Sequence, residues 1–130
     1  MNTLDARSQC GNDLLDVCAE KFQGGRFIRS FPVQLEGQRQ GETLPVRKYN
    51  ILLSNGTTYK ISACNANEYP GRAIISIHHE DELIGSTYLL ETREHLPFLL
   101  IDCTQTGLYN LSIYFENGLE GCAVGIISSQ

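Results

Sequence analysis

The sequence predicts an all-β fold, a jelly-roll-like antiparallel sandwich of about eight strands preceded by a short helix. The clearest pattern is Gly107-Leu108-Tyr109-Asn110-Leu111-Ser112-Ile113-Tyr114-Phe115, where every second residue from Tyr109 to Phe115 is apolar and the residues between are more polar. A period of two is typical of a strand with one buried and one wetter face. Similar runs recur along the last two-thirds of the chain, separated by turn residues at regular intervals, as expected of a sandwich or a barrel.

The size and composition favour one folded domain. The chain has 130 residues and a mass of 14.5 kDa, and 42% of its residues are hydrophobic. A chain of this length buries about two-thirds of the surface that its unfolded form exposes. No stretch rich in Pro, Gly or Ser divides the sequence. We therefore expect a single domain over residues 1–130, with a tail and a helix in 1–24 and the sandwich in 27–128.

The charge balance argues against nucleic acid as a partner. The net charge is −5 and the pI is about 5.1, whereas phosphate binding needs a concentrated basic surface. No apolar run approaches the roughly 20 residues of a membrane-spanning helix. Residues 1–6 lack the basic and apolar regions of a signal peptide. This leaves a cytosolic chain and the mature form of an exported chain as alternatives.

The expected helix begins near Asn12, a good N-cap residue, and ends before Gly24 and Gly25. One face of this helix carries the residues that would dock on a sheet, namely Leu14, Leu15, Cys18 and Phe22.

The expected strands cover residues 27–35, 46–53, 58–64, 73–77, 83–90, 98–103, 107–115 and 122–128. In the first strand, Phe27 and Arg29 would share a side with Phe31 and Val33, and Pro32 should confine this strand to a sheet edge. Asn55-Gly56 predicts a tight hairpin. Residues 98–103 are apolar on both faces, which predicts a central strand.

Several of these elements together resemble the prepeptidase C-terminal (PPC) family of bacterial β-sandwich domains. The matching motifs, in the family's order over residues 46–128, are Tyr49-x-Ile51-x-Leu53, Asn55-Gly56-Thr57-Thr58-Tyr59-x-Ile61, Ala73-x-Ile75-x-Ile77, Phe98-x-Leu100-x-Asp102 and Thr106-Gly107-x-Tyr109-x-Leu111-x-Ile113. Members of this family are non-catalytic modules of secreted bacterial proteins, and some bind polysaccharide or calcium. The resemblance therefore implies an exported chain, in the periplasm or at the cell surface.

The five cysteines leave several pairings open. The sandwich and the resemblance favour disulfides over five reduced thiols. Cys64 and Cys103 each end an expected strand, so they would be bridged if the two strands are neighbours. Cys122 would then join the last strand to Cys10 or Cys18.

The candidate sites are sparse. His78 and His79 point to opposite faces of a strand, so they do not chelate one ion, but Glu80, Asp81 and Glu82 would supply part of a calcium site in a loop. The exposed tyrosines, Tyr69, Tyr88 and Tyr114, together with Asn110 beside Tyr114, are the candidates for a contact surface.

Catalysis is not favoured by the sequence. It contains no Gly-x-Ser-x-Gly motif. A catalytic role for Cys103 as a thiol nucleophile, with His95 as its base, is less favoured than a structural role, because this cysteine ends an apolar run. We expect no enzyme and no cofactor other than calcium. The preferred function is a non-catalytic secreted or cell-surface module that binds protein or polysaccharide. A carbohydrate- or calcium-binding accessory domain and a small hydrolase are the alternatives.

Overall fold

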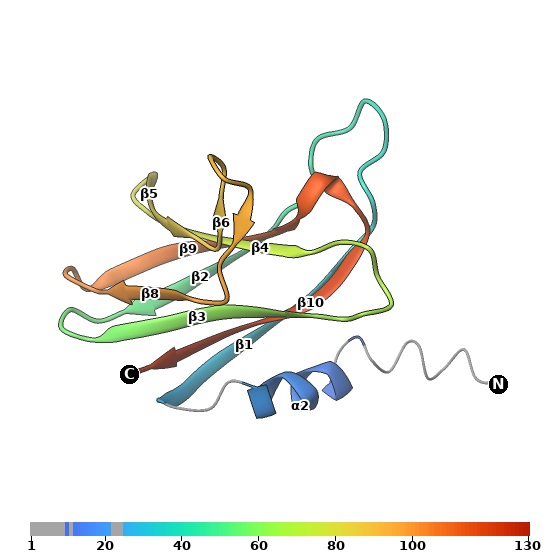
Figure 1. Ribbon diagram of the computed structural model, residues 1–130. Coiled ribbons are helices and arrows are strands. Elements are labelled where there is room, and N and C mark those ends of the chain that lie inside the picture. The colour runs from blue at the N-terminus through green and yellow to red at the C-terminus, as the bar shows by residue number, and fades with distance from the viewer. Residues whose placement is uncertain (1–9, 11, 22–24) are drawn as a thin grey trace.

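The computed structural model describes residue 10, residues 12–21 and residues 25–130. Two four-stranded antiparallel sheets pack face to face (Figure 1). The first sheet contains, in spatial order, β1 (Arg26–Leu35), β10 (Gly121–Ser129), β3 (Thr58–Asn65) and β8 (Leu99–Asp102). The second contains β2 (Arg47–Leu53), β9 (Gly107–Phe115), β4 (Ala73–His79) and β5 (Glu82–Ser86). The predicted all-β sandwich is confirmed.

The pairing order is nested along the chain. Strand β1 pairs with β10, β2 with β9, β3 with β8, and β4 with β5, an order in keeping with a jelly roll. The remaining described elements are α2 (Asn12–Lys21), the short strands β6 (Tyr88–Leu89) and β7 (Glu94–His95), and the 3-10 turn η1 (Glu116–Gly118). Neither helical element of the described chain is long and apolar enough to cross a membrane.

The core lies between the two sheets, and the predicted alternation places residues in it correctly. Ile75 and Ile77 of β4 are fully buried against Leu111 and Ile113 of β9. Tyr109 and Phe115, at the two ends of β9, are buried on the same side. Burial of these large side chains contributes about 1.5–3 kcal/mol each to folding. Because this gain requires apolar residues on one face of each strand, the period of two in the sequence identifies the core residues.

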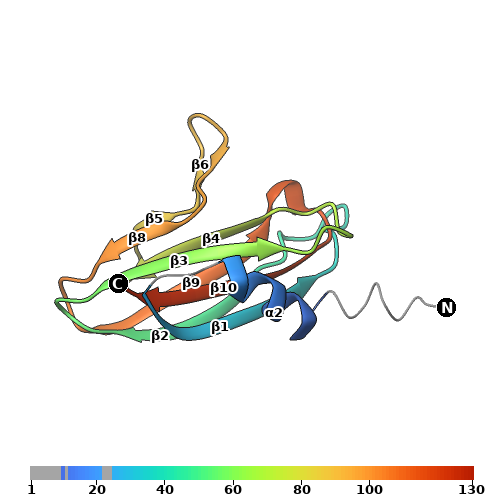
Figure 2. The ribbon, with the colours of Figure 1, turned by 60° about the horizontal axis from the view of Figure 1, so that its bottom comes forward.

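A second, smaller core lies on the outer face of the first sheet. Leu14 and Cys18 of α2 pack there against Val124 and Ile126 of β10, and Figure 2 shows the helix lying over this sheet. Strand β10 is consequently buried on both faces. The predicted docking of the helix is confirmed for Leu14, Leu15 and Cys18, while Phe22 lies outside the described residues.

The prediction of a central strand at residues 98–103 is wrong. Strand β8 is at the edge of the first sheet, and Leu100 remains 55% exposed. The two inner strands of this sheet are β10 and β3, and β10 is buried on both faces because α2 covers it. The prediction that Pro32 lies in an edge strand is confirmed by β1.

The predicted hairpin at Asn55-Gly56 is also wrong. This turn joins β2 in the second sheet to β3 in the first. The Thr57 N–H donates to the Ser54 carbonyl at 3.3 Å, and Gly56 alone of the two central residues has a positive φ, at 90°. These features are typical of a type II turn, which needs glycine at its third position.

Two strands depart from their predicted course. A bulge between Phe27 and Arg29 shifts the register of β1, and Phe27 is exposed. Arg29 is also exposed but shares the predicted side with the buried Phe31, since its guanidinium carbon lies 4.7 Å from the centroid of the Phe31 ring. The single strand expected over residues 83–90 divides into β5 and β6, because Thr87 between them turns inward and bonds to β4.

Candidate functional site

The hairpin formed by β6 and β7 projects from the sandwich (Figures 1 and 2). Its base is fixed to β4 through the buried Thr87. The Ile75 N–H donates to the Thr87 hydroxyl, and the Thr87 N–H donates to the Ile75 carbonyl, both at 2.9 Å. At the tip, the Arg93 N–H donates to the Leu89 carbonyl at 2.7 Å. The base of the projecting segment is therefore bonded to the sandwich, and its tip is closed by a hydrogen bond within the hairpin.

A second anchor joins the hairpin to η1. His95 Nε2 lies 2.9 Å from Glu116 Oε1, and the Tyr88 ring packs on the His95 ring with the centroids 4.8 Å apart. The hydrogen bond from His95 lowers the pKa of Glu116. Burial, followed by the adjacent Glu116, raises the pKa of Tyr88.

The hairpin encloses a groove of about 550 Å³ on the outer face of the second sheet, which we call the outer groove. Its floor includes Ser76 and His78 of β4 and Tyr114 of β9. These side chains point outward because their neighbours Ile75, Ile77 and Ile113 point into the core. Its apolar wall is formed by Leu83 of β5 and by Tyr88, Leu89 and Leu90 of the hairpin.

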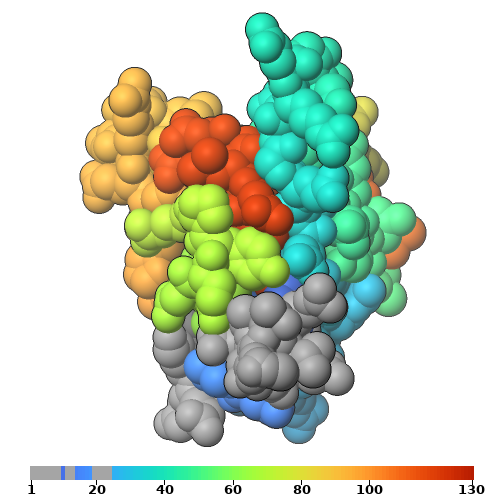
Figure 3. Space-filling model, turned by 90° about the vertical axis from the view of Figure 1, so that its right-hand side faces the viewer, coloured from blue at the N-terminus to red at the C-terminus, as the bar shows by residue number. Residues whose placement is uncertain are grey.

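The wall of the outer groove is unusually open to solvent. Leu83 is 56% exposed, Leu89 41% and Leu90 82%. Contiguous exposed apolar side chains rimmed by polar residues mark interaction sites more often than isolated ones do. A second cavity of about 460 Å³ adjoins this wall and shares Tyr88, Leu90 and Tyr114 with it. Figure 3 shows the hairpin (orange) and the loop over residues 36–46 (teal) on the two sides of η1 (red), where the second cavity lies.

The floor offers polar groups that the described chain leaves unused. Ser76 is only 8% exposed, yet its hydroxyl has no hydrogen-bond partner among the described residues. The same holds for the imidazole of His78 and the hydroxyl of Tyr114. Burial raises the pKa of Tyr114 above its ordinary value of 10.0. Buried polar groups usually have partners, so this floor is suited to receive them from a ligand.

Two carboxylates, Glu91 and Glu94, lie on the groove side of the hairpin, and three more form a turn at which Glu82 is paired with His79, whose ring stacks on the core-facing Tyr109. Glu91 lines the groove, Glu94 is opposite Leu89 in the hairpin, and Glu80, Asp81 and Glu82 form the turn between β4 and β5. All five are exposed. The ion pairs of the described residues are Arg39–Glu36 and His95–Glu116, so none of these five carboxylates has a cationic partner there.

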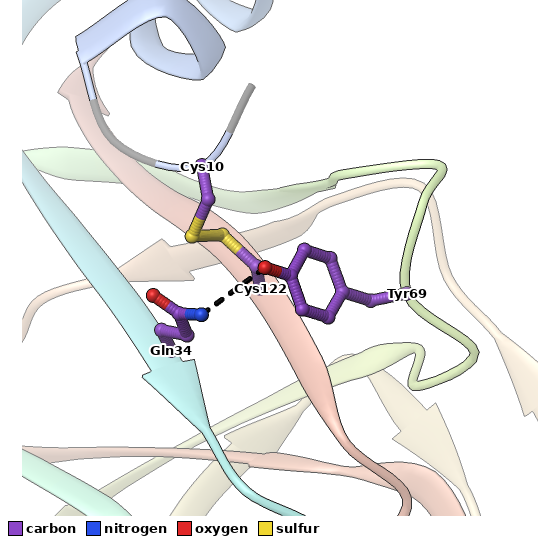
Figure 4. The surroundings of a disulfide bond; sticks show 4 residues. All are labelled: Cys10, Gln34, Tyr69 and Cys122. Atoms are coloured by element: carbon purple, nitrogen blue, oxygen red, sulfur yellow. Dashed lines mark hydrogen bonds between the residues drawn. A yellow bond between two sulfur atoms is a disulfide. The ribbon is translucent and has the colours of Figure 1, made fainter. Parts of the chain in front are cut away.

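The structure brings together two of the four tyrosine and asparagine candidates. Tyr88 and Tyr114 both line the outer groove, and Asn110 is exposed on the same face, paired with His78. Tyr69 lies elsewhere, over the Cys10–Cys122 disulfide, where its hydroxyl accepts a hydrogen bond from Gln34 Nε2 at 3.1 Å (Figure 4). Sequence reasoning missed Leu89 and Leu90, although two leucines beside a charged loop were a usable signal.

The calcium prediction gains no geometric support. Glu80 and Asp81 form a two-residue turn, both with positive φ, that places Glu82 opposite His79. Across the part of the chain that is described, no three His, Cys, Asp or Glu side chains are grouped so that they hold a metal ion.

The disulfides are Cys10–Cys122 and Cys18–Cys64. The first bridge joins Cys122 to Cys10, one of its two predicted partners. The predicted Cys64–Cys103 bridge is wrong. Strands β3 and β8 are neighbours, yet the Cys103 N–H bonds to Thr57, and Cys64 lies at the far end of β3. Cys64 also faces α2, whereas Cys103 faces the core between the sheets.

Cys103 is a buried thiol in a closed environment. Its Sγ lies 3.3 Å from the Gln105 carbonyl and 3.6 Å from the Tyr109 hydroxyl. The hydrogen bond with Cys103, followed by burial, raises the pKa of Tyr109 to about 12. His95, the base considered for a thiol nucleophile, bonds to Glu116 instead. This geometry is that of a core cysteine.

The comparisons with known proteins bear on the fold. No family model matches this chain and no curated protein sequence is similar to it, so the resemblance to the PPC family stays a prediction. Among solved structures, the chain is similar to the crystal structure of Aeromonas hydrophila PliG, a periplasmic lysozyme inhibitor of g-type lysozyme. The TM-score is 0.58 at 13% sequence identity, and the match covers 84% of this chain and 91% of that one. This chain therefore shares the sandwich fold of that inhibitor over most of the length of both proteins.

Proposed function

We propose that this chain is a non-catalytic, extracytoplasmic module that binds another protein through the outer groove, and that a g-type lysozyme is the first partner to test. The observation that carries the proposal is the exposed apolar wall of Leu83, Leu89 and Leu90 on a hairpin fixed at both ends. A rigid apolar surface loses little conformational entropy on association, and this favours specific binding.

The size and composition of the groove suit a protein contact. A few apolar and aromatic anchors surrounded by a polar rim provide most of the binding energy in protein interfaces. Here the anchors are the leucines of the wall together with Tyr88 and Tyr114, and the rim carries the carboxylates of Glu91 and Glu94. The fold likeness to PliG supports the choice of a lysozyme, because PliG is an inhibitor of g-type lysozyme.

The extracytoplasmic location rests on the disulfides. Two bridges tie the helical segment to the sandwich, and such bridges persist mainly in oxidising compartments. PliG is periplasmic, and the same compartment is proposed for this chain.

The test is inhibition of a purified g-type lysozyme acting on a suspension of peptidoglycan. We expect stoichiometric inhibition by the wild-type chain and at least about tenfold weaker inhibition by Leu90→Asp, since a central apolar anchor is worth over 1 kcal/mol. Leu108→Asp is the matched control, because Leu108 is 63% exposed on the same sheet and does not line the groove. Full lysozyme activity at excess wild-type chain would exclude this partner, and equal loss in both variants would exclude the groove.

A further inference from the structure

We propose that the outer groove receives an extended segment of the partner protein in which one apolar side chain is flanked by lysine or arginine. This inference rests on the proposed function and specifies the chemistry of the partner. Three properties of the groove carry it, namely an apolar wall, an unpartnered polar floor and an unpaired acidic rim.

The apolar wall sets the requirement for an anchor side chain. Leu89 and Leu90 of the hairpin face Leu83 of β5 across a volume of about 550 Å³, which is in the range of sites that take part of a drug-sized ligand or a few side chains. Because the three leucines are largely exposed, covering them with one apolar side chain removes apolar surface of both partners from water.

The floor sets the requirement for peptide groups. The Ser76 hydroxyl both donates and accepts hydrogen bonds, and so do the Tyr114 hydroxyl and a neutral His78 ring. Each of these groups lacks a partner among the described residues, and Ser76 is more than nine-tenths buried. An extended segment offers alternating N–H and carbonyl groups, so it satisfies all three without requiring a particular side chain.

The rim sets the requirement for positive charge. Residues 80–94 contain five carboxylates and one guanidinium, Arg93, so this segment carries a net charge of −4 out of −5 for the whole chain. The five carboxylates have no cationic partner within the described chain. Charge complementarity of this kind steers association and sets specificity. An uncharged oligosaccharide would use the hydroxyls and the tyrosine rings but would gain nothing from the rim.

The experiment follows amide chemical shifts of the full-length ¹⁵N-labelled chain during four titrations. The probes are a peptide with one leucine between two pairs of lysines, its analogue with alanine for the leucine, its analogue with glutamates for the lysines, and chitotetraose. We expect saturable shifts at Ser76, His78, Leu90 and Tyr114 with the first peptide. The alanine analogue should bind about tenfold more weakly, and the glutamate analogue should not bind.

Matched variants separate the rim and wall contributions. Glu91→Lys with Glu94→Lys should weaken binding of the lysine peptide by about tenfold, and added salt should narrow that difference in affinity. Glu68→Lys with Glu120→Lys makes the same charge change at exposed sites outside the groove and should change little. Leu90→Ala should weaken binding, whereas Leu108→Ala should not. All four altered sites in the two charge variants are exposed, so we expect these variants to fold.

Several results would overturn the inference. These are equal binding of the lysine and glutamate peptides, shifts outside the groove, an equal effect of the two charge variants, or saturable binding of chitotetraose alone. The outcome is independent of the lysozyme assay. If the chain inhibits lysozyme but no peptide binds in the groove, the proposed function stands and this inference fails. If the peptide binds but lysozyme is not inhibited, this inference stands and a g-type lysozyme is excluded as the partner.

Discussion

His95 and Glu116 hold the wall of the outer groove to the sandwich, with His95 Nε2 at 2.9 Å from Glu116 Oε1. The two residues are 21 positions apart, one in β7 and the other in η1. The His95 side chain is 9% exposed and that of Glu116 is 30% exposed. This contact and the Thr87 bonds to β4 restrain opposite sides of the same hairpin, which is what a preformed binding surface requires.

Replacing Glu116 with glutamine should make the free energy of unfolding less dependent on pH in the acidic range. The pKa of Glu116 is lowered in the folded chain, chiefly by the hydrogen bond from His95, from an ordinary value of 4.5. A carboxyl group whose pKa is lower in the folded than in the unfolded chain stabilises the fold at pH values above the unfolded pKa. This stabilisation is lost as the pH falls through the folded pKa. Between about pH 5 and about pH 3, the wild type should therefore lose more unfolding free energy than Glu116→Gln.

Denaturant unfolding at a series of pH values checks this prediction. Glu94→Gln is the matched control, because Glu94 is exposed beside His95 and has no ion-pair partner in the described chain. Parallel profiles for the wild type and Glu116→Gln would contradict the role assigned to the pair.

Removing the bridge between α2 and β3 should destabilise the chain strongly. Cys18 and Cys64 are 46 residues apart in sequence, and closing a loop of that length corresponds to about 4 kcal/mol in the chain-entropy model. Cys18→Ala with Cys64→Ala should lower the unfolding free energy by an amount of this order in urea or guanidinium titrations. Cys103→Ser retains both bridges and is the control. A double variant as stable as this control would show that α2 docks without the bridge.

Among the glycines that the structure describes, Gly121 has the closest neighbour at the position where a Cβ would lie. A Cβ at Gly121 would overlap the ring of Phe115, which is fully buried in the core. Gly121→Ala should cost about 1–3 kcal/mol, the usual range for overpacking. Gly107→Ala is a milder comparison, since its nearest neighbour is His79 Nε2 at 3.3 Å. Thermal melts of the two variants measure the difference, and equal melting temperatures would mean that the Phe115 ring shifts freely.

Local sequence patterns were sufficient to predict which face of a strand is buried, but not which strands are neighbours in a sheet. The alternation in β9 identified Tyr109 and Phe115 as core residues, because side-chain direction depends only on position within the strand. Whether β8 is central or at an edge depends on which elements cover it, and this is decided by the distant α2. The Asn55-Gly56 turn was recognised, but its crossing between sheets follows from pairings with β9 and β10.

The site was predictable only in part for the same reason. Tyr88 and Tyr114 were selected as exposed aromatic residues, and the structure brings them together in the outer groove. Leu89 and Leu90 were assigned to a continuous strand. The break that exposes them comes from Thr87 bonding to Ile75, twelve residues earlier in the chain, and no local pattern reports such a contact.

The central claim, protein binding through the outer groove, is tested most directly by hydrogen–deuterium exchange of the full chain with and without a g-type lysozyme. Binding through the outer groove predicts slower exchange in the lysozyme complex over residues 82–92, together with unchanged exchange in α2 on the opposite sheet. Protection of α2 or β1 with residues 82–92 unchanged would place the contact on another face of the sandwich and contradict the account.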